Sequence, residues 1–329
     1  MGRMASHYSP LEKAIRNQDA NRVEKHLTQL LSKQRTDLSY YLRLVLDVGS
    51  PEIIKKVMEL LLQYNLPLRV GENGMGPIHY VAFRRDKRLL DFLQTLGFSL
   101  AERDLVGRNA YHYWVAGGQK ELLPPEYYQP DNQGVTPIHI AAQLGNIEIL
   151  EKLLEEMPSR LEERDEKGNT PLHYAAIGSS KEAAEFLLRK GASLYTRNRR
   201  NETPEQVAMG KGNMGIKRYL EEIGHVYRRA FAALREKNKK EIERVLALYP
   251  NPQDRFGNTL LHKVMDEEMA LWLIEKGVNT LSLNHDGITP FIALQEKGLK
   301  RAAQEIAKRR SLTPQEEEYL KKEGVVYAE

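Results

Sequence analysis

The chain of 329 residues carries 49 Lys and Arg against 45 Asp and Glu, a formal net charge of only +4, and no cysteine. It therefore has no disulfide, no thiolate metal site and no thiol nucleophile, and so small a charge gives no argument for a nucleic-acid partner. No apolar run reaches the ~18 residues that a membrane-spanning helix needs, and the first residues lack the apolar core of a signal peptide. These features favour a protein of a reducing compartment, the cytoplasm.

The first part of the chain is predicted to form two pairs of helices. Apolar residues recur at helical spacing over residues 10–16 and 21–31, and again over residues 38–47 and 51–62. We treat residues 1–66 as one predicted segment, because an atypical pattern is expected of the end of a repeat array.

From residue 67 onward, a four-residue motif recurs along the chain. It is complete as Thr170-Pro171-Leu172-His173 and nearly complete as Thr136-Pro137-Ile138-His139. A glycine or asparagine precedes these motifs, and neighbouring copies are mostly about 33 residues apart, a period that indicates a repeat architecture. The weaker copies are Gly76-Pro77-Ile78-His79, Asn109-Ala110-Tyr111-His112, Thr203-Pro204, Thr259-Leu260-Leu261-His262 and Thr289-Pro290.

Each repeat is predicted to be a helix–turn–helix unit. In the repeat that contains the complete motif, Thr170 caps the first helix and Pro171 occupies its first turn, where proline is tolerated. The second helix is predicted over residues 182–189, and Gly191 follows as a helix stop. Such a unit cannot bury its apolar face alone, so it must stack on its neighbours.

The same template predicts helices of the other repeats. They are expected over residues 145–154, 217–223, 230–237, 240–247, 288–294 and 299–310. Two places interrupt the pattern. The adjacent prolines Pro124-Pro125 predict an irregular loop or a one-turn stub between residues 118 and 131. Residues 210–215 and the junction at Gly224-His225, between two predicted helices, predict a second interruption, where the stack either bends or splits into two sub-arrays.

The motif, its spacing and its upstream glycine resemble the ankyrin-repeat family over nearly the whole chain. The resemblance implies an all-α solenoid of helix–turn–helix units with short β-turn or hairpin tips. On this basis we divide the chain into degenerate N-terminal helix pairs (residues 1–66), main repeats (67–224), C-terminal repeats with their cap (225–310) and an acidic tail or short helix (311–329).

The histidines of the motif copies are predicted to be structural; they are His79, His112, His139, His173 and His262. Each repeat supplies one of them, and a helix-packing distance of ~8–10 Å keeps neighbours too far apart to share a zinc ion. In the family this histidine hydrogen-bonds the backbone of the adjoining turn. We therefore predict no metal site.

No pattern typical of an active site stands out. Residues 210–215 match G-x-G-x-x-G, but a helix rather than a strand is predicted before them, so a dinucleotide site is not expected. The sequence contains no nucleophile elbow, zincin motif, phosphate-binding loop or kinase motif. We expect a non-enzymatic protein with no cofactor and no small-molecule substrate.

The resemblance implies that a partner protein binds in a concave groove formed by the turn tips and the exposed sides of the first helices. These positions are free because the second helices and the inward faces are committed to stacking. The candidate partner-binding residues at these positions are Phe83, Arg84, Val106, Arg108, Gln143, Leu144, Asn169, Ile177, Arg199, Arg200, Arg255 and Phe256.

Two further interpretations remain open. Basic residues at 84–88 and 197–200 are patches that would attract nucleic acid or an anionic membrane, and Met1-Gly2 begins a myristoylation pattern. The glutamates at 316–318 resemble the glutamate-rich secretion signal of type IV effectors from intracellular bacteria, among which degenerate ankyrin arrays are common. That resemblance implies delivery into a host cell, whereas Thr313 and Glu316 form a capping-box pattern that predicts an ordinary short helix.

Overall fold

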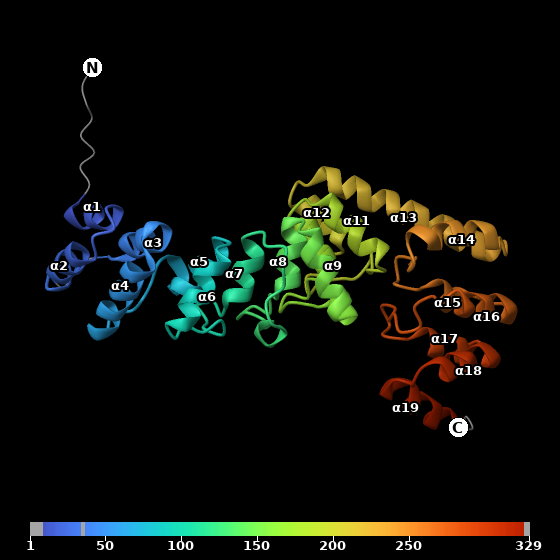
Figure 1. Cartoon of the computed structure of the whole chain (residues 1–329). Helices are drawn as coiled ribbons and strands as arrows, with labels where there is room; N and C mark the ends of the chain where they lie inside the picture. Colours follow the sequence, from blue (N-terminus) through green and yellow to red (C-terminus); the bar gives the residue numbers. More distant parts are fainter. Residues whose placement is uncertain (1–8, 34–36, 326–329) are drawn as a thin grey trace, which may run out of the picture. The chain divides into compact units, whose positions relative to one another are not determined.

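The computed structural model describes residues 9–33 and 37–325, which form helices joined by turns (Figure 1). The β-structure of these residues is one isolated bridge between Gln253 and Thr259. None of the helices they form is both long and apolar enough to cross a bilayer. The all-α fold class is confirmed, whereas the myristoylation pattern at Met1-Gly2 lies outside the described residues.

The chain divides into two compact units, and the first comprises residues 1–141. Its helices are α1 (Pro10–Arg16), α2 (Ala20–Leu31), α3 (Ser39–Val48), α4 (Pro51–Gln63), α5 (Pro77–Phe83), α6 (Lys87–Thr95) and α7 (Ala110–Ala116), with the short 3-10 helices η1 (Glu72–Gly74) and η2 (Pro125–Tyr127). α8 (Pro137–Leu144) crosses the boundary between the units. The first helices α1, α3, α5 and α7 pack successively in one row, and α2 packs on α4 in the other.

The N-terminal helix pairs lie where the sequence predicts them, to within about two residues, which is the usual uncertainty of a helix end. α4 shows why. Ser50 caps it by accepting the Ile53 N–H at 3.3 Å, and proline occupies the first turn. Its buried face consists of Ile53, Val57 and Leu61, which recur at intervals of four residues.

The repeat that contains α7 has no second α-helix, as its adjacent prolines predict. The chain instead forms the single 3-10 turn η2. Side chains attach this segment to α7: the Trp114 indole N–H donates to the Glu121 carbonyl oxygen at 2.7 Å, and Asn109 Nδ2 donates to the Tyr127 carbonyl oxygen at 2.7 Å. These bonds fix the irregular segment without a helical ladder.

The second unit comprises residues 142–329. Its helices are α9 (Ile147–Glu156), α10 (Pro171–Ile177), α11 (Lys181–Arg189), α12 (Pro204–Gly210), α13 (Met214–Arg235), α14 (Lys239–Leu248), α15 (Leu260–Lys263), α16 (Glu267–Glu275), α17 (Pro290–Glu296), α18 (Lys300–Arg309) and α19 (Pro314–Glu323), with the 3-10 helix η3 (Pro158–Glu162). α9 and α17 each begin two residues later than predicted, because Asn146 and Thr289 are the residues that cap them.

The predicted helix break at Gly224-His225 is wrong. α13 is one helix of 22 residues, drawn as an unbroken ribbon in Figure 1, and it joins the helices predicted over residues 217–223 and 230–237. Gly224 is buried, and a Cβ atom there would lie 2.8 Å from the Tyr195 hydroxyl oxygen. The glycine therefore permits a close approach and does not stop the helix.

α13 serves two neighbouring repeats. It packs on α11 and α12, and also on α14 and α15. Ala230, Phe231 and Leu234 in its later part belong to the hydrophobic core that continues through α14 to α18. One continuous helix thus acts as the second helix of one repeat and the first helix of the next. The predicted division of the chain between residues 224 and 225 falls inside it.

The glutamate-rich tail forms α19, and the capping box predicted from Thr313 and Glu316 is confirmed. Glu316 is fully buried, and its carboxylate accepts Arg310 Nη1 at 2.7 Å and Thr289 Oγ1 at 2.8 Å. Burial by itself raises the pKa of this carboxyl, but the hydrogen bonds outweigh it and the pKa is lowered. Because Leu320 joins the core beside α17, α19 covers the last repeat.

Candidate functional site

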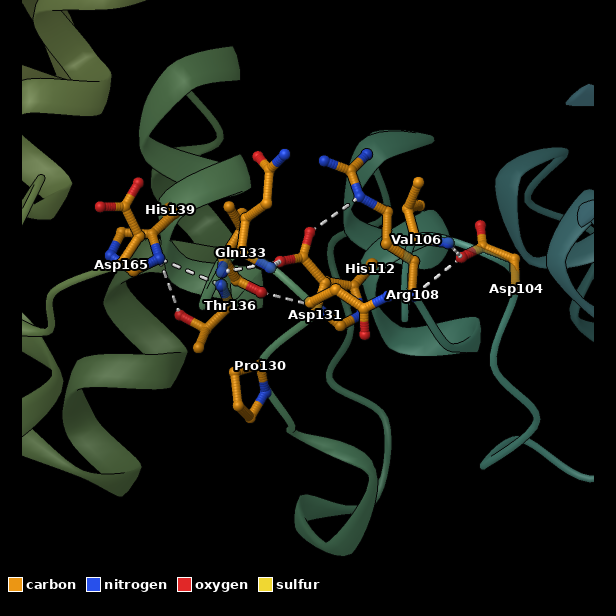
Figure 2. A network of polar contacts seen from close by, with 12 residues as sticks. Asp104, Val106, Arg108, His112, Pro130, Asp131, Gln133, Thr136, His139 and Asp165 are labelled. Atoms are coloured by element: carbon orange, nitrogen blue, oxygen red, sulfur yellow. Dashed lines mark hydrogen bonds and ion pairs between the residues drawn. The ribbon is translucent and has the colours of Figure 1, made fainter. Parts of the chain in front are cut away.

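The turn tips of the repeats are shaped by an aspartate or asparagine. In the first unit, the Asp131 carboxylate accepts the backbone N–H groups of Gln133 at 2.8 Å and Val135 at 2.9 Å. Asp104 accepts the Arg108 N–H in the same way. Figure 2 shows that the Arg108 side chain also reaches from its own tip to Asp131 on the next, at 3.2 Å. Such a side chain satisfies donors that a tight turn leaves without backbone partners.

Sequence reasoning did not identify this position, although a signal was present. An Asp or Asn stands three residues before the tip glycine or asparagine, and it accepts the N–H groups two and four residues further on. The members of this set in the second unit are Asp165, Asn198, Asp254 and Asn284.

Neighbouring tips are joined by backbone hydrogen bonds. In the first unit the Asn132 N–H donates to the Val106 carbonyl oxygen at 2.9 Å, and in the second unit the Arg199 N–H donates to the Lys167 carbonyl oxygen at 2.9 Å. Two further pairs of this kind are Leu105 with Asn73 and His285 with Phe256. Because consecutive tips are tied together, their side chains lie beside one another.

The motif histidines connect each first helix to the following tip, as predicted. In His173, Nδ1 accepts the Thr170 N–H at 3.1 Å and Nε2 donates to the Glu202 carbonyl oxygen at 2.9 Å. The carbonyl partners of His79, His112 and His262 are Glu102, Val135 and Ile288. Burial lowers the pKa of His112 and of His173 to about 4, so both rings are neutral at physiological pH.

The next features are possible metal-binding clusters and the G-x-G-x-x-G segment. Among the residues that the structure describes, no three His, Asp or Glu side chains gather in a way that would hold a metal ion. The G-x-G-x-x-G segment is the turn between α12 and α13. Its Asn213 donates through Nδ2 to the carbonyl oxygens of Ala176 at 2.7 Å and Ile177 at 3.1 Å, so it caps the end of α10.

Among the candidates in the first unit, Phe83 is the most available for binding. It is the last residue of α5 and is 46% exposed. Arg84 follows it, with Nε 3.5 Å from Asp47 Oδ1 in an exposed ion pair. Arg108 is committed to the next tip through its carboxylate partner, and Val106 is half-buried with its carbonyl oxygen in the tip-to-tip bond.

In the second unit, Asn169, Ile177, Arg199 and Arg200 line one hollow of about 720 Å³. It lies between the tips at residues 166–169 and 198–202 and the helices α10 and α12. Arg199 and Arg200 are exposed, and Ile177 is half-buried. Asn169 is only 8% exposed, because its amide oxygen accepts Asn198 Nδ2 at 3.0 Å. The expectation that Asn169 is exposed is therefore wrong.

Three further residues line the same hollow and were missed from sequence. Val207 adds apolar surface beside Ile177, and Lys167 and Lys211 add positive charge. Lys167 directly precedes the tip residue Gly168, just as Arg200 precedes Asn201 in the next repeat. The position of Lys167 could therefore have been predicted from the sequence. Four basic side chains and two acidic ones, Glu166 and Glu202, line the hollow, which gives it a positive balance.

The remaining candidates lie outside this hollow. Gln143 and Leu144 are exposed at the end of α8, and Gly178 packs so closely there that a Cβ atom would lie 1.9 Å from the Gln143 carbonyl oxygen. Arg255 and Phe256 are exposed on a tip further along the unit, Phe256 by 68%. The structure thus brings together only some of the second-unit candidates.

Comparisons with known proteins find the same repeat. The family model for ankyrin repeats (3 copies) matches residues 120–198. Putative ankyrin repeat protein L271 of Acanthamoeba polyphaga mimivirus is 33% identical over 106 residues, which are 29% of this chain and 14% of that protein. SH3 and multiple ankyrin repeat domains protein 2 of Homo sapiens is 30% identical over 201 residues, 58% of this chain and 10% of that protein.

A third relative, putative ankyrin repeat protein FPV223 of Fowlpox virus (strain NVSL), is 27% identical over 105 residues, 30% of this chain and 74% of that protein. The chain therefore spans only a small part of the length of the first two relatives. The paired helices, the linked tips and the buried histidines extend the same pattern over both units. Together with these matches, they support an ankyrin-repeat family for this chain.

Proposed function

We propose that this chain is a non-enzymatic protein–protein interaction module that binds a partner protein through the hollow of its second unit. Ankyrin repeats in general indicate a protein-binding module. The observation that carries the finer proposal is the hollow of about 720 Å³ in which Ile177, Arg199 and Arg200 come together.

The chemistry of this hollow favours an acidic segment with an apolar side chain. Arg199 and Arg200 are exposed in the hollow, and no ion pair with a carboxylate is formed by either among the described residues, so their guanidinium groups are available to a ligand. Arginine at an interface contributes more binding energy than most residue types. Ile177 and Val207 offer apolar surface between these charges.

The test is capture of partners from a cytosolic extract, with identification by mass spectrometry. Replacing Lys167, Arg199 and Arg200 together with alanine should reduce the affinity by about thirty-fold or more, from a loss of roughly 2–5 kcal/mol. The matched control replaces Arg229 and Arg235, exposed arginines on α13, with alanine. Equal capture by the parent and the triple variant would place the binding surface elsewhere, and Phe83→Ala then tests the first unit.

Binding of nucleic acid or of an anionic membrane is the alternative, and the structure provides less support for it. In the basic patch at residues 84–88, Arg84 pairs with Asp47 at 3.5 Å and Lys87 with Asp91 at 2.8 Å. Binding assays on the parent and on the same triple variant distinguish a protein partner from nucleic acid or a membrane. Tight binding of a random duplex or anionic vesicles that weakens steeply with salt, in place of protein capture, would favour the alternative.

We further propose that the protein acts in the cytosol and, more specifically, in the cytosol of a host cell into which it is delivered. The glutamate run supports it weakly, because Glu316 is buried in the cap and only Glu317 and Glu318 are exposed. A translocation reporter fused to the parent and to a Glu317→Gln, Glu318→Gln variant tests it. Equal delivery of both would remove the role of the run.

A further inference from the structure

A second hollow of the second unit forms where turn tips far apart in sequence meet. Its volume is about 460 Å³. One wall consists of Arg164, Ser193, Thr196, Arg197 and Asn201, and the other consists of Gly257, Leu283, Asn284, His285 and Gly287. It is distinct from the hollow of the proposed function, because neither Arg199 nor Arg200 lines it.

Three hydrogen bonds join the two chain segments that supply these walls. Ser193 Oγ donates to Gln253 Oε1 at 2.6 Å, and His285 Nε2 donates to the Tyr195 carbonyl oxygen at 3.0 Å. Asn251 Nδ2 donates to the Gly191 carbonyl oxygen at 3.0 Å. These bonds join residues that are 60 or 90 positions apart, so the hollow is formed before any ligand arrives.

The charge of this hollow is entirely positive. Arg164 and Arg197 line it, and no Asp or Glu is among its lining residues. One N–H of each guanidinium is anchored, Arg164 Nη1 to the Arg197 carbonyl oxygen at 3.2 Å and Arg197 Nη1 to Asn201 Oδ1 at 3.1 Å. Neither has a carboxylate partner in the part of the chain that the structure describes, so their other N–H groups remain available.

Two carboxylates of the adjoining segments already accept hydrogen bonds. Glu162 Oε1 accepts the Ser193 N–H at 2.6 Å. Asp254 Oδ1 accepts the N–H groups of Phe256 and Asn258, each at 2.9 Å. The hydroxyl of Thr196 adds a further polar group to the lining. The site thus offers donors and positive charge to an anion, and no competing anion lines it.

We propose that this hollow binds the phosphate group of a small phosphorylated molecule. Guanidinium groups match the oxygens of a phosphate in pairs, and a hydroxyl completes such a site. An adjoining hollow of about 380 Å³ shares Arg164, Ser193, Thr196 and Leu283, and it is also lined by Leu161, Leu281 and the carboxylate residue Glu162. It provides room and apolar surface for the rest of the molecule, and the volumes are those of small-molecule sites.

The test is a titration of the isotope-labelled full chain by nuclear magnetic resonance at low ionic strength. The probes are inorganic phosphate, free phosphoserine, a nucleoside monophosphate and, as the carboxylate comparison, acetate. We expect saturable shifts at the amides of Ser193, Thr196 and His285 with the phosphate probes only. The strongest of the three shows whether a free phosphate, an amino-acid phosphate or a nucleotide is preferred.

Replacing Arg164 and Arg197 with glutamine should weaken phosphate binding by about tenfold for each lost guanidinium. Leu283→Glu, at a side chain that is 56% exposed, should weaken it as well, by placing a carboxylate in the hollow while leaving folding intact. Arg199→Gln with Arg200→Gln is the matched control: it should keep phosphate binding and lose partner capture. Absent saturation, equally strong acetate binding, or an equal loss in the control would overturn the proposal without affecting the proposed function.

Discussion

Gly224 shows how a residue that is unfavourable in most helices is required by a neighbour. Glycine in a helix interior costs about 1 kcal/mol relative to alanine, because it has more conformational freedom to lose. At residue 224 the glycine leaves room for Tyr195, because a Cβ atom there would lie 2.8 Å from the tyrosine hydroxyl oxygen. The effect of adding a methyl group therefore depends on the tyrosine hydroxyl.

A double-mutant cycle tests this dependence. In the parent, Gly224→Ala should have little benefit, because the contact offsets the gain in helix propensity. In a Tyr195→Phe background the nearest remaining ring atom is 3.9 Å away, an ordinary contact, so the same change should stabilise the protein by about 0.5–1 kcal/mol. The measurement is chemical denaturation of all four proteins. An identical effect in both backgrounds would contradict the role given to the hydroxyl.

At the scale of elements, α19 depends on one buried carboxylate. Glu316 accepts hydrogen bonds from Arg310, Thr289 and its own cap residue Thr313, and it is completely inaccessible to solvent. Removing one partner of a buried ion pair leaves the other charge unpaired, which costs roughly 3–5 kcal/mol. The last repeat should be the part that loses this stability, because each repeat contacts only its neighbours.

We expect Glu316→Gln to release α19 and to raise hydrogen exchange along α17 and α19. Glu317→Gln is the matched control: its side chain is exposed, and the change should be within about 0.5 kcal/mol of neutral. The expected loss is greatest above pH 4.5, the ordinary pKa of a glutamate, and it shrinks as the pH falls from there through the lowered pKa of Glu316. Equal protection of α19 in both variants would show that its packing suffices.

The segment around η2 is the other element with a distinct local stability. Its backbone bonds are the two short-range contacts of Tyr127 and Tyr128 with the prolines, each 3.1 Å long. Local opening therefore breaks few bonds. We expect the amides of residues 126–128 to exchange faster than those of residues 149–154 in α9, as measured by native-state hydrogen exchange. Equal protection would show that the side-chain contacts to α7 are sufficient to close the segment.

At the scale of the whole molecule, the buried histidines link stability to pH. The pKa of His112 and of His173 is about 4 in the folded protein against a reference value of 6.5. Between these values the unfolded chain binds more protons than the native one, so stability falls as the pH decreases from about 6.5 to 4. A shift of this size corresponds to roughly 3 kcal/mol for one histidine.

Chemical denaturation across this pH range should show the decline. His173→Gln should reduce the slope of the unfolding free energy against pH, because one of the neutral rings is removed. The same change should lower the stability at neutral pH. A pH-independent midpoint, or the same slope in the His173 variant, would contradict this linkage.

Sequence by itself determined most of the helices, the turn tips and the histidine contacts. A Ser or Thr cap, a proline in the first turn and apolar residues three or four positions apart all act within one helix, as at Ser50 and Thr170. The contacts of the motif histidine followed from the resemblance to ankyrin repeats, and its two backbone partners belong to its own repeat and the next. The position of Arg199 and Arg200 on a turn tip was predicted as well, because they directly precede the tip residue Asn201.

Only the tertiary structure decided that α13 continues through Gly224, that Asn169 is buried, and that Lys167 and Lys211 join Arg199 in one hollow. Each of these depends on a residue of another repeat. Gly224 reads as a helix stop until Tyr195 is known to pack on it, and the contact of His285 with Tyr195 spans 90 positions. Contacts over such distances leave no periodic signal in the sequence, because their energy depends on how whole repeats are oriented.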